Sequence, residues 1–201
     1  MRPEGGAGSR ARLLGRARRL GGALLVVALG SPAGGDEPAV ASLLKSVNLV
    51  AYSPGTMPPP FGSATLDGRP LALTDLRGRV VILNFWASWC PECRAEMPRL
   101  ESLHRAYAAR GLAIVGVNVR DDASAVRRHA EELSLTFPLV LDPGGRINAL
   151  YGVIGLPTSF VLGRDGRAVA FGVGPHEWGG APAQVVLGAL LAEPASRAGV
   201  R

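Results

Sequence analysis

Both cysteines of this 201-residue chain lie in one short segment, WASWCPECRAEMP at residues 86–98. Two residues separate Cys90 from Cys93, a spacing that suits a redox-active disulfide, part of a metal site or haem attachment. An apolar run before the pair and helical periodicity after it place Cys90 at a helix N-terminus, where backbone N–H groups and the helix dipole favour a thiolate. Pro91 suits the first helical turn, because its missing N–H is no loss there. We therefore expect Cys90 to be the attacking, exposed sulfur and Cys93 the resolving one.

Other uses of the two thiols fit the sequence less well. Haem attachment requires a histidine directly after the second cysteine, but that residue is Arg94. Structural zinc requires four ligands, and the three histidines are scattered without ligand-like spacing: His104, His129 and His176. A purely structural disulfide would close a loop too short to stabilise much through chain entropy. Copper capture stays open, but we expect redox exchange, with no bound metal and no cofactor other than the disulfide itself.

Alternating strand and helix patterns position the pair. A nearly continuous apolar run at 79–85 predicts a strand buried on both faces. After the cysteines, apolar residues at helical spacing predict a helix that ends at Gly111: Met97, Leu100, Leu103, His104 and Tyr107. The other expected elements are strands at 112–119, 137–141, 158–162 and 167–174, helices from Ser124 to about Leu133 and over 146–152 and 181–193, and hairpin turns at Asp67-Gly68 and Asp165-Gly166. This order predicts an α/β sheet with helices on both faces.

The formal charge of +6 is concentrated at the N-terminus. Residues 1–30 hold six arginines and one glutamate, which leaves about +1 for the rest of the chain, so nucleic-acid binding is not indicated. The arginines precede an apolar run at 20–30 and then small residues, the pattern of a secretory signal. The run is shorter than the ~20 residues that span a bilayer. We expect a periplasmic or otherwise extracytoplasmic protein that contacts the membrane only through this segment, if the segment is uncleaved.

Four parts of the chain are expected. Residues 1–35 form the signal peptide or signal-anchor, 36–60 an amphipathic segment and Pro-rich linker, 61–193 one globular domain and 194–201 a C-terminal tail. Apolar residues at helical spacing predict a short amphipathic helix or a spacer in 39–50: Val40, Leu43, Leu44, Val47 and Val50. Three successive prolines exclude regular structure in 53–60.

The segment VVILNFWASWCPECRAEMPRL resembles the active-site block of thioredoxin-fold proteins, and specifically the secreted bacterial oxidoreductases of the TlpA, ResA and CcmG (DsbE) type. DGRPLALTDLRGRVV resembles that group's N-terminal hairpin, and FPLVLDPGGRINALYGVIGLPTSFVLGRDGRAV resembles its second half. The resemblance covers about residues 61–192. It implies a thioredoxin-like domain: a central mixed sheet flanked by helices, with an added N-terminal β-hairpin and an inserted strand–helix element.

The resemblance also implies roles for residues near the cysteines. Pro157 matches the cis-proline that faces the disulfide in this fold and presents the backbone of Leu156 to an extended substrate. Trp89 resembles the tryptophan that shields the nucleophile. Glu96 matches a glutamate of the ResA-type proteins; if partly buried, such a carboxyl group could take the proton of Cys93.

Two positions depart from thioredoxin itself. Asn84 stands where thioredoxin has a buried aspartate, so that proton acceptor is absent. Glu92 stands between the cysteines in place of glycine, and so close a carboxylate should oppose thiolate formation and favour a reducing pair. The candidate catalytic residues are Cys90, Cys93 and Glu96. The candidate substrate-binding residues are Trp89, Pro91, Glu92, Leu156 and Pro157.

The expected function is thiol-disulfide exchange that reduces protein disulfides outside the cytosol. The family favours apocytochrome c as a substrate and implies a membrane-bound electron donor of the DsbD/CcdA type. A peroxiredoxin is one alternative, but it needs a hydroxyl residue three positions before the reactive cysteine, where this chain has Ala87. A chaperone that uses the dithiol to hold copper, or to keep a partner's ligands reduced, is the other.

Overall fold

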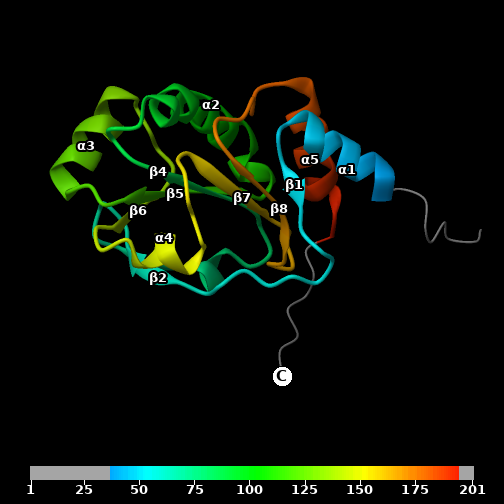
Figure 1. Cartoon of the computed structure of the whole chain (residues 1–201), viewed down its shortest axis with the longest axis horizontal. Helices are drawn as coiled ribbons and strands as arrows, with labels where there is room; N and C mark the ends of the chain where they lie inside the picture. The colour runs from blue at the N-terminus through cyan, green and yellow to red at the C-terminus, as the bar shows by residue number, and fades with distance from the viewer. Residues whose placement is uncertain (1–36, 195–201) are drawn as a thin grey trace, which may run out of the picture. The chain divides into compact units, whose positions relative to one another are not determined.

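The computed structural model describes residues 37–194 (Figure 1). The expected leader and residues 195–201 of the expected tail lie outside the described residues. Within 37–194, six strands form one mixed sheet in the order β1-β8-β7-β4-β5-β6, and two more form a separate hairpin. No helix in this range is long and apolar enough to cross a membrane.

The elements alternate along the chain much as predicted. The sheet consists of β1 (Val50–Ala51), β4 (Val80–Trp86), β5 (Leu112–Val119), β6 (Leu139–Asp142), β7 (Thr158–Leu162) and β8 (Ala168–Val173). The hairpin pairs β2 (Gly62–Ala64) with β3 (Pro70–Ala72). The helices are α1 (Glu37–Ser46), α2 (Pro91–Tyr107), α3 (Ala123–Glu132), α4 (Arg146–Leu150) and α5 (Ala181–Ala192), with short 3-10 helices η1 (Leu73–Leu76) and η2 (Ala108–Arg110).

The central strand, β4, runs parallel to β5 and antiparallel to β7. Every residue of β4 and β5 is buried, because their side chains alternate between two hydrophobic cores. One core packs against α1, α2, α3 and α5, and the other against α4, η1 and the segment around the hairpin. Figure 1 shows α2 and α3 on one side of the sheet and α4 and β2 on the other. This double cover holds the end of β4, and therefore the cysteines, in a fixed place.

Two local expectations are wrong. The sequence allows Ser124 to cap the helix that runs to about Leu133, but the helix begins at Ala123 and its cap is Asp122, whose Oδ1 accepts the backbone N–H groups of Ser124 and Ala125 at 2.8 and 2.9 Å. Both Asp and Ser are good cap residues, so the sequence does not separate them. Val50 does not continue the apolar face of α1, because it lies in β1 with 59% of its surface exposed.

Part of the segment 36–60 packs on the sheet. Leu44 and Val47 are buried in the first core, and α1 packs against α5. The strand β1 pairs with β8, with Val50 opposite Phe171. The elements α1 and β1 therefore pack with the sheet although they precede residue 61, where the globular domain was expected to begin. As predicted, residues 53–60 form neither helix nor strand.

Candidate active site

The two cysteines lie at the start of α2, just after the end of β4. Cys90 is the N-cap of α2 and Cys93 lies in its first turn, behind Pro91 at the first helical position. Their sulfur atoms form a disulfide, with the Cα atoms 5.3 Å apart. The backbone N–H of Cys93 points at Sγ of Cys90 from 3.1 Å. In the reduced protein, this donor and the helix dipole would stabilise a thiolate on Cys90.

The expected difference in exposure between the cysteines is small. Cys90 is 4% exposed and Cys93 1%, so Cys90 is not an exposed residue, contrary to expectation. Cys90 does line a surface groove, whereas Cys93 is not among the residues of that groove. Attack from outside can therefore reach Cys90 first.

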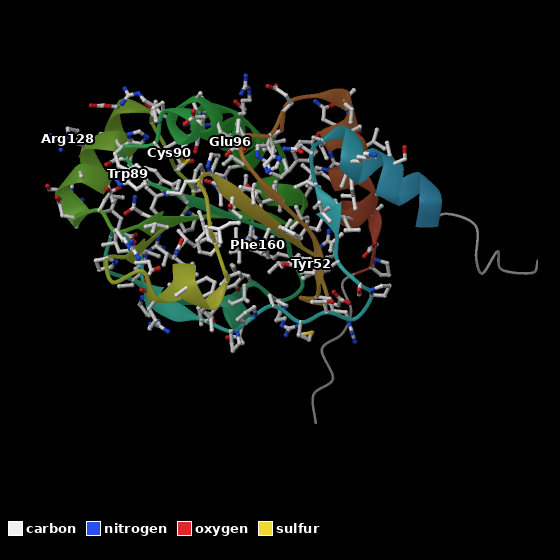
Figure 2. All side chains as sticks on the ribbon, viewed as in Figure 1. Tyr52, Trp89, Cys90, Glu96, Arg128 and Phe160 are labelled. Atoms are coloured by element: carbon white, nitrogen blue, oxygen red, sulfur yellow. A yellow bond between two sulfur atoms is a disulfide. The ribbon has the colours of Figure 1, made fainter. Side chains whose placement is uncertain are left out.

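The groove has a volume of about 480 Å³ and apolar walls. One wall consists of Trp89, Cys90, Pro91 and Glu92, and the other of Asn148, Val153, Ile154, Gly155 and Leu156. Trp89 is 65% exposed and Ile154 is 94% exposed, which is unusual for large apolar side chains and typical of a surface that binds a partner. Figure 2 shows Trp89 beside Cys90 at the start of α2.

Of the five expected substrate-binding residues, four line this groove. The fifth, Pro157, is buried directly behind Leu156, and the peptide bond between the two is cis. Sequence reasoning did not find Ile154 or Asn148. A lone isoleucine in the loop sequence GVIGLP gives no periodic signal that separates an exposed side chain from a buried one.

Glu96 lies farther along α2 than the cysteines (Figure 2). Its side chain is 1% exposed and so more buried than expected. The carboxyl group accepts three hydrogen bonds: from the backbone N–H of His176 at 2.9 Å, from Nε1 of Trp178 at 2.8 Å and from Nδ2 of Asn84 at 3.0 Å. Burial raises the pKa of Glu96 above its ordinary value of 4.5, although these donors oppose the shift. The group can thus hold a proton at a pH where an exposed glutamate has lost it.

Residues three apart on a helix are neighbours on one face, so Glu96 lies on the same side of α2 as Cys93. Sequence reasoning noted Asn84 only as a departure from thioredoxin and His176 only as one of three scattered histidines, and it did not find Trp178. The available signal was a tryptophan inside the glycine-rich stretch GVGPHEWGG at 172–180. A large aromatic side chain in such a loop usually has a buried partner.

The fold and this site define the thioredoxin-like class of proteins, with a C-x-x-C disulfide at the start of a helix. A family model described as the AhpC/TSA family matches residues 54–170, and the chain belongs to that family. The chain is 37% identical over 115 residues to the thiol-disulfide oxidoreductase ResA of Bacillus thuringiensis, which covers 57% of this chain and 66% of the relative. The match thus spans slightly less than two thirds of that relative's length.

Solved structures agree in fold. A putative thiol:disulfide interchange protein DsbE from Chlorobium tepidum is similar with a TM-score of 0.64 and 31% identity, over 70% of this chain and 99% of that chain. A secreted disulfide oxidoreductase of Mycobacterium tuberculosis is similar with a TM-score of 0.56 and 29% identity, over 65% of this chain and 96% of that chain. The described domain therefore shares the fold of solved proteins that are named as thiol:disulfide interchange proteins or disulfide oxidoreductases.

Proposed function

We propose that the protein reduces disulfide bonds of other proteins outside the cytosol. The observation that carries this proposal is the position of Cys90, which caps α2 and lines an exposed apolar groove with Glu96 buried one turn beyond Cys93. The groove supports a protein substrate, because an extended segment can lie between Trp89 and Ile154 with backbone groups near Leu156.

The exchange moves two electrons and needs no cofactor beyond the cysteine pair. The Cys90 thiolate attacks one sulfur of the substrate disulfide, which forms a mixed disulfide and releases the first substrate thiolate. Cys93 then gives its proton to Glu96 and attacks Sγ of Cys90, which releases the second substrate thiolate. The substrate is reduced and the Cys90–Cys93 pair is oxidised.

The reduced pair must be regenerated from outside the chain. We propose a membrane-bound thiol–disulfide donor of the DsbD/CcdA type, which would reduce the Cys90–Cys93 disulfide by the same exchange in reverse roles. The arginine-rich leader supports an extracytoplasmic location, as does the similarity to a secreted mycobacterial oxidoreductase. Apocytochrome c is the substrate we propose, because the sequence resembles cytochrome-c-maturation proteins.

The reduction potential of the Cys90–Cys93 pair tests whether the protein reduces or oxidises its substrate. Equilibration with glutathione or thioredoxin buffers should give a value near the reducing end (~−270 mV), and a value near ~−120 mV would refute a reductase. The partner is tested with Cys93→Ser, which should accumulate a mixed disulfide through Cys90. Cys90→Ser should form none and is the matched control.

Peroxide reduction is the alternative that the family description raises. The residue three before Cys90 is Ala87, which is buried and has no hydroxyl group. We therefore expect no peroxide turnover in an assay with a thioredoxin-type reductant. Copper binding by the dithiol is tested by titration with Cu(I); among the described residues, no group of three or more His, Cys, Asp or Glu side chains is placed to hold a metal.

A further inference from the structure

The loop between β8 and α5 holds the carboxyl group of Glu96. His176 and Trp178, two residues apart on this loop, both donate to the same oxygen, Oε1, at 2.9 and 2.8 Å. Trp178 is almost fully buried, so its indole N–H depends on this acceptor. The expected roles around the cysteines include no residue of this loop.

The two donors make the two oxygens of the Glu96 carboxyl group unequal. A carboxylate oxygen has two lone pairs, and those of Oε1 are taken by the two N–H groups. A proton therefore binds at Oε2, whose partner is Nδ2 of Asn84 at 3.0 Å. Nδ2 also lies 3.0 Å from Oγ of Ser159.

Asn84 can form a hydrogen bond with Glu96 in both the ionised and the protonated state of the carboxyl group. Its Oδ1 is buried and has no hydrogen-bond partner within residues 37–194, which is costly for a buried oxygen. Half a turn of the side-chain amide exchanges Nδ2 with Oδ1. The oxygen would then accept the O–H of protonated Glu96 and the hydroxyl of Ser159.

The loop itself is held firmly in place. The Nδ1 atom of His176 lies 3.1 Å from the carbonyl oxygen of Val47, at the end of α1, so Nδ1 is the donor. A Cβ atom at Gly172 would lie 2.4 Å from Cε1 of His176, so the ring packs directly on β8. Glu177 pairs with Arg99 of α2 at 3.5 Å. The loop is thus fixed to β8, α1 and α2, and the indole N–H cannot drift away from Glu96.

We propose that Trp178 is a positioning residue of the exchange reaction: its indole N–H, with the backbone N–H of His176, occupies Oε1 of Glu96 and directs the proton of Cys93 to Oε2, beside Asn84. This inference rests on the proposed function, in which Glu96 takes that proton. The titratable group that acts on the carboxyl group is His176 on the loop. Cys93 lies three residues before Glu96 on α2, and the Arg99–Glu177 pair joins α2 to the loop.

The test compares two tryptophans. Trp178→Phe keeps most of the ring and removes the N–H, so the ionised carboxylate loses a donor and the midpoint of the pH profile for release of the mixed disulfide should rise by about one pH unit. Trp86→Phe is the matched control, because Trp86 is fully buried and its Nε1 has no partner in the described part of the chain. Coincident profiles of the two variants would overturn the role of Trp178.

A second measurement uses the unaltered, oxidised protein and does not depend on either variant folding. In an NMR titration, the indole N–H resonance of Trp178 should shift with the same midpoint as the carboxyl carbon of Glu96, and that of Trp86 should not. An indole N–H resonance of Trp178 that does not shift as the carboxyl group of Glu96 titrates would refute the proposal. The wild-type protein could fail to exchange disulfides while the Trp178 and Glu96 resonances still shift together. That result would refute the proposed function, and with it the role of Trp178 in exchange, but it would confirm the hydrogen bond between Trp178 and Glu96.

Discussion

The side-chain amide of Asn84 lies 3.0 Å from Oε2 of Glu96, inside the protein and away from solvent. A neutral amide here leaves the carboxyl group free to ionise without a second negative charge beside it. Burial therefore raises the pKa of Glu96, against three hydrogen-bond donors and the electrostatic interaction with His176, which lower it. This balance has a consequence for stability as well as for exchange.

Glu96→Gln should change how the free energy of unfolding depends on pH. Because burial raises the pKa of Glu96 above its ordinary 4.5, the folded state keeps a proton that the unfolded state loses. The stabilising effect is complete below the unfolded pKa and is lost as pH rises through the folded pKa. Glutamine cannot titrate, so the variant should gain stability relative to wild type as the pH rises from the ordinary pKa of 4.5 through the raised folded-state pKa. Urea unfolding of both oxidised proteins measures this, and a constant difference across that range would contradict it.

Ile154→Ser should weaken substrate binding without affecting folding. The side chain is almost wholly exposed on the groove wall, so the change removes apolar area that a partner would bury. We expect kcat/KM for a protein disulfide to fall about fivefold, equivalent to about 1 kcal/mol. Exchange with a small disulfide should be unaltered. Val185→Ser, at an exposed position on α5, is the control; an equal loss in both variants would exclude a role for Ile154 in the groove.

Glu92→Gln should make the pair slightly less reducing. The Glu92 side chain is exposed in the first turn of α2, next to the cysteines, and its negative charge opposes the Cys90 thiolate. An exposed charge has a modest effect, so we expect the potential to rise by about 10–20 mV and the difference to shrink at high salt. The thiolate absorbance should appear at lower pH in the variant. An unchanged thiolate titration would show that Glu92 does not tune the pair.

Leu44→Ala should destabilise the domain although it lies outside the region that resembles the family. Leu44 lies on α1 and is buried against the core that includes α5. Its truncation should therefore lower the free energy of unfolding by about 2–4 kcal/mol. Lys45→Ala, an exposed neighbour on the same helix, should change stability by less than about 0.5 kcal/mol. Equal unfolding midpoints for the two variants would mean that α1 does not stabilise the domain.

The sequence predicted the parts whose patterns are local. The strands β4 and β5 are nearly continuous apolar runs because they are buried on both faces, and the cysteine spacing with Pro91 indicates a helix start. The remaining features depend on contacts between distant segments. Trp178 meets Glu96 across 82 positions of sequence, and β1 has two residues, too few for any periodicity to register. Tertiary contacts of this kind leave no pattern in a single sequence.

Both edges of the sheet are short or covered by the chain itself. One edge is the strand β1, which has only two residues. Beyond β6, the backbone N–H of Leu66 donates to the carbonyl of Leu139 at 2.7 Å, and Thr65 bridges to Val140. Short or covered edges discourage chains from adding to one another strand by strand. A protein with the function proposed above can therefore pair with an extended substrate segment at the groove, while its sheet edges resist aggregation with the same substrate.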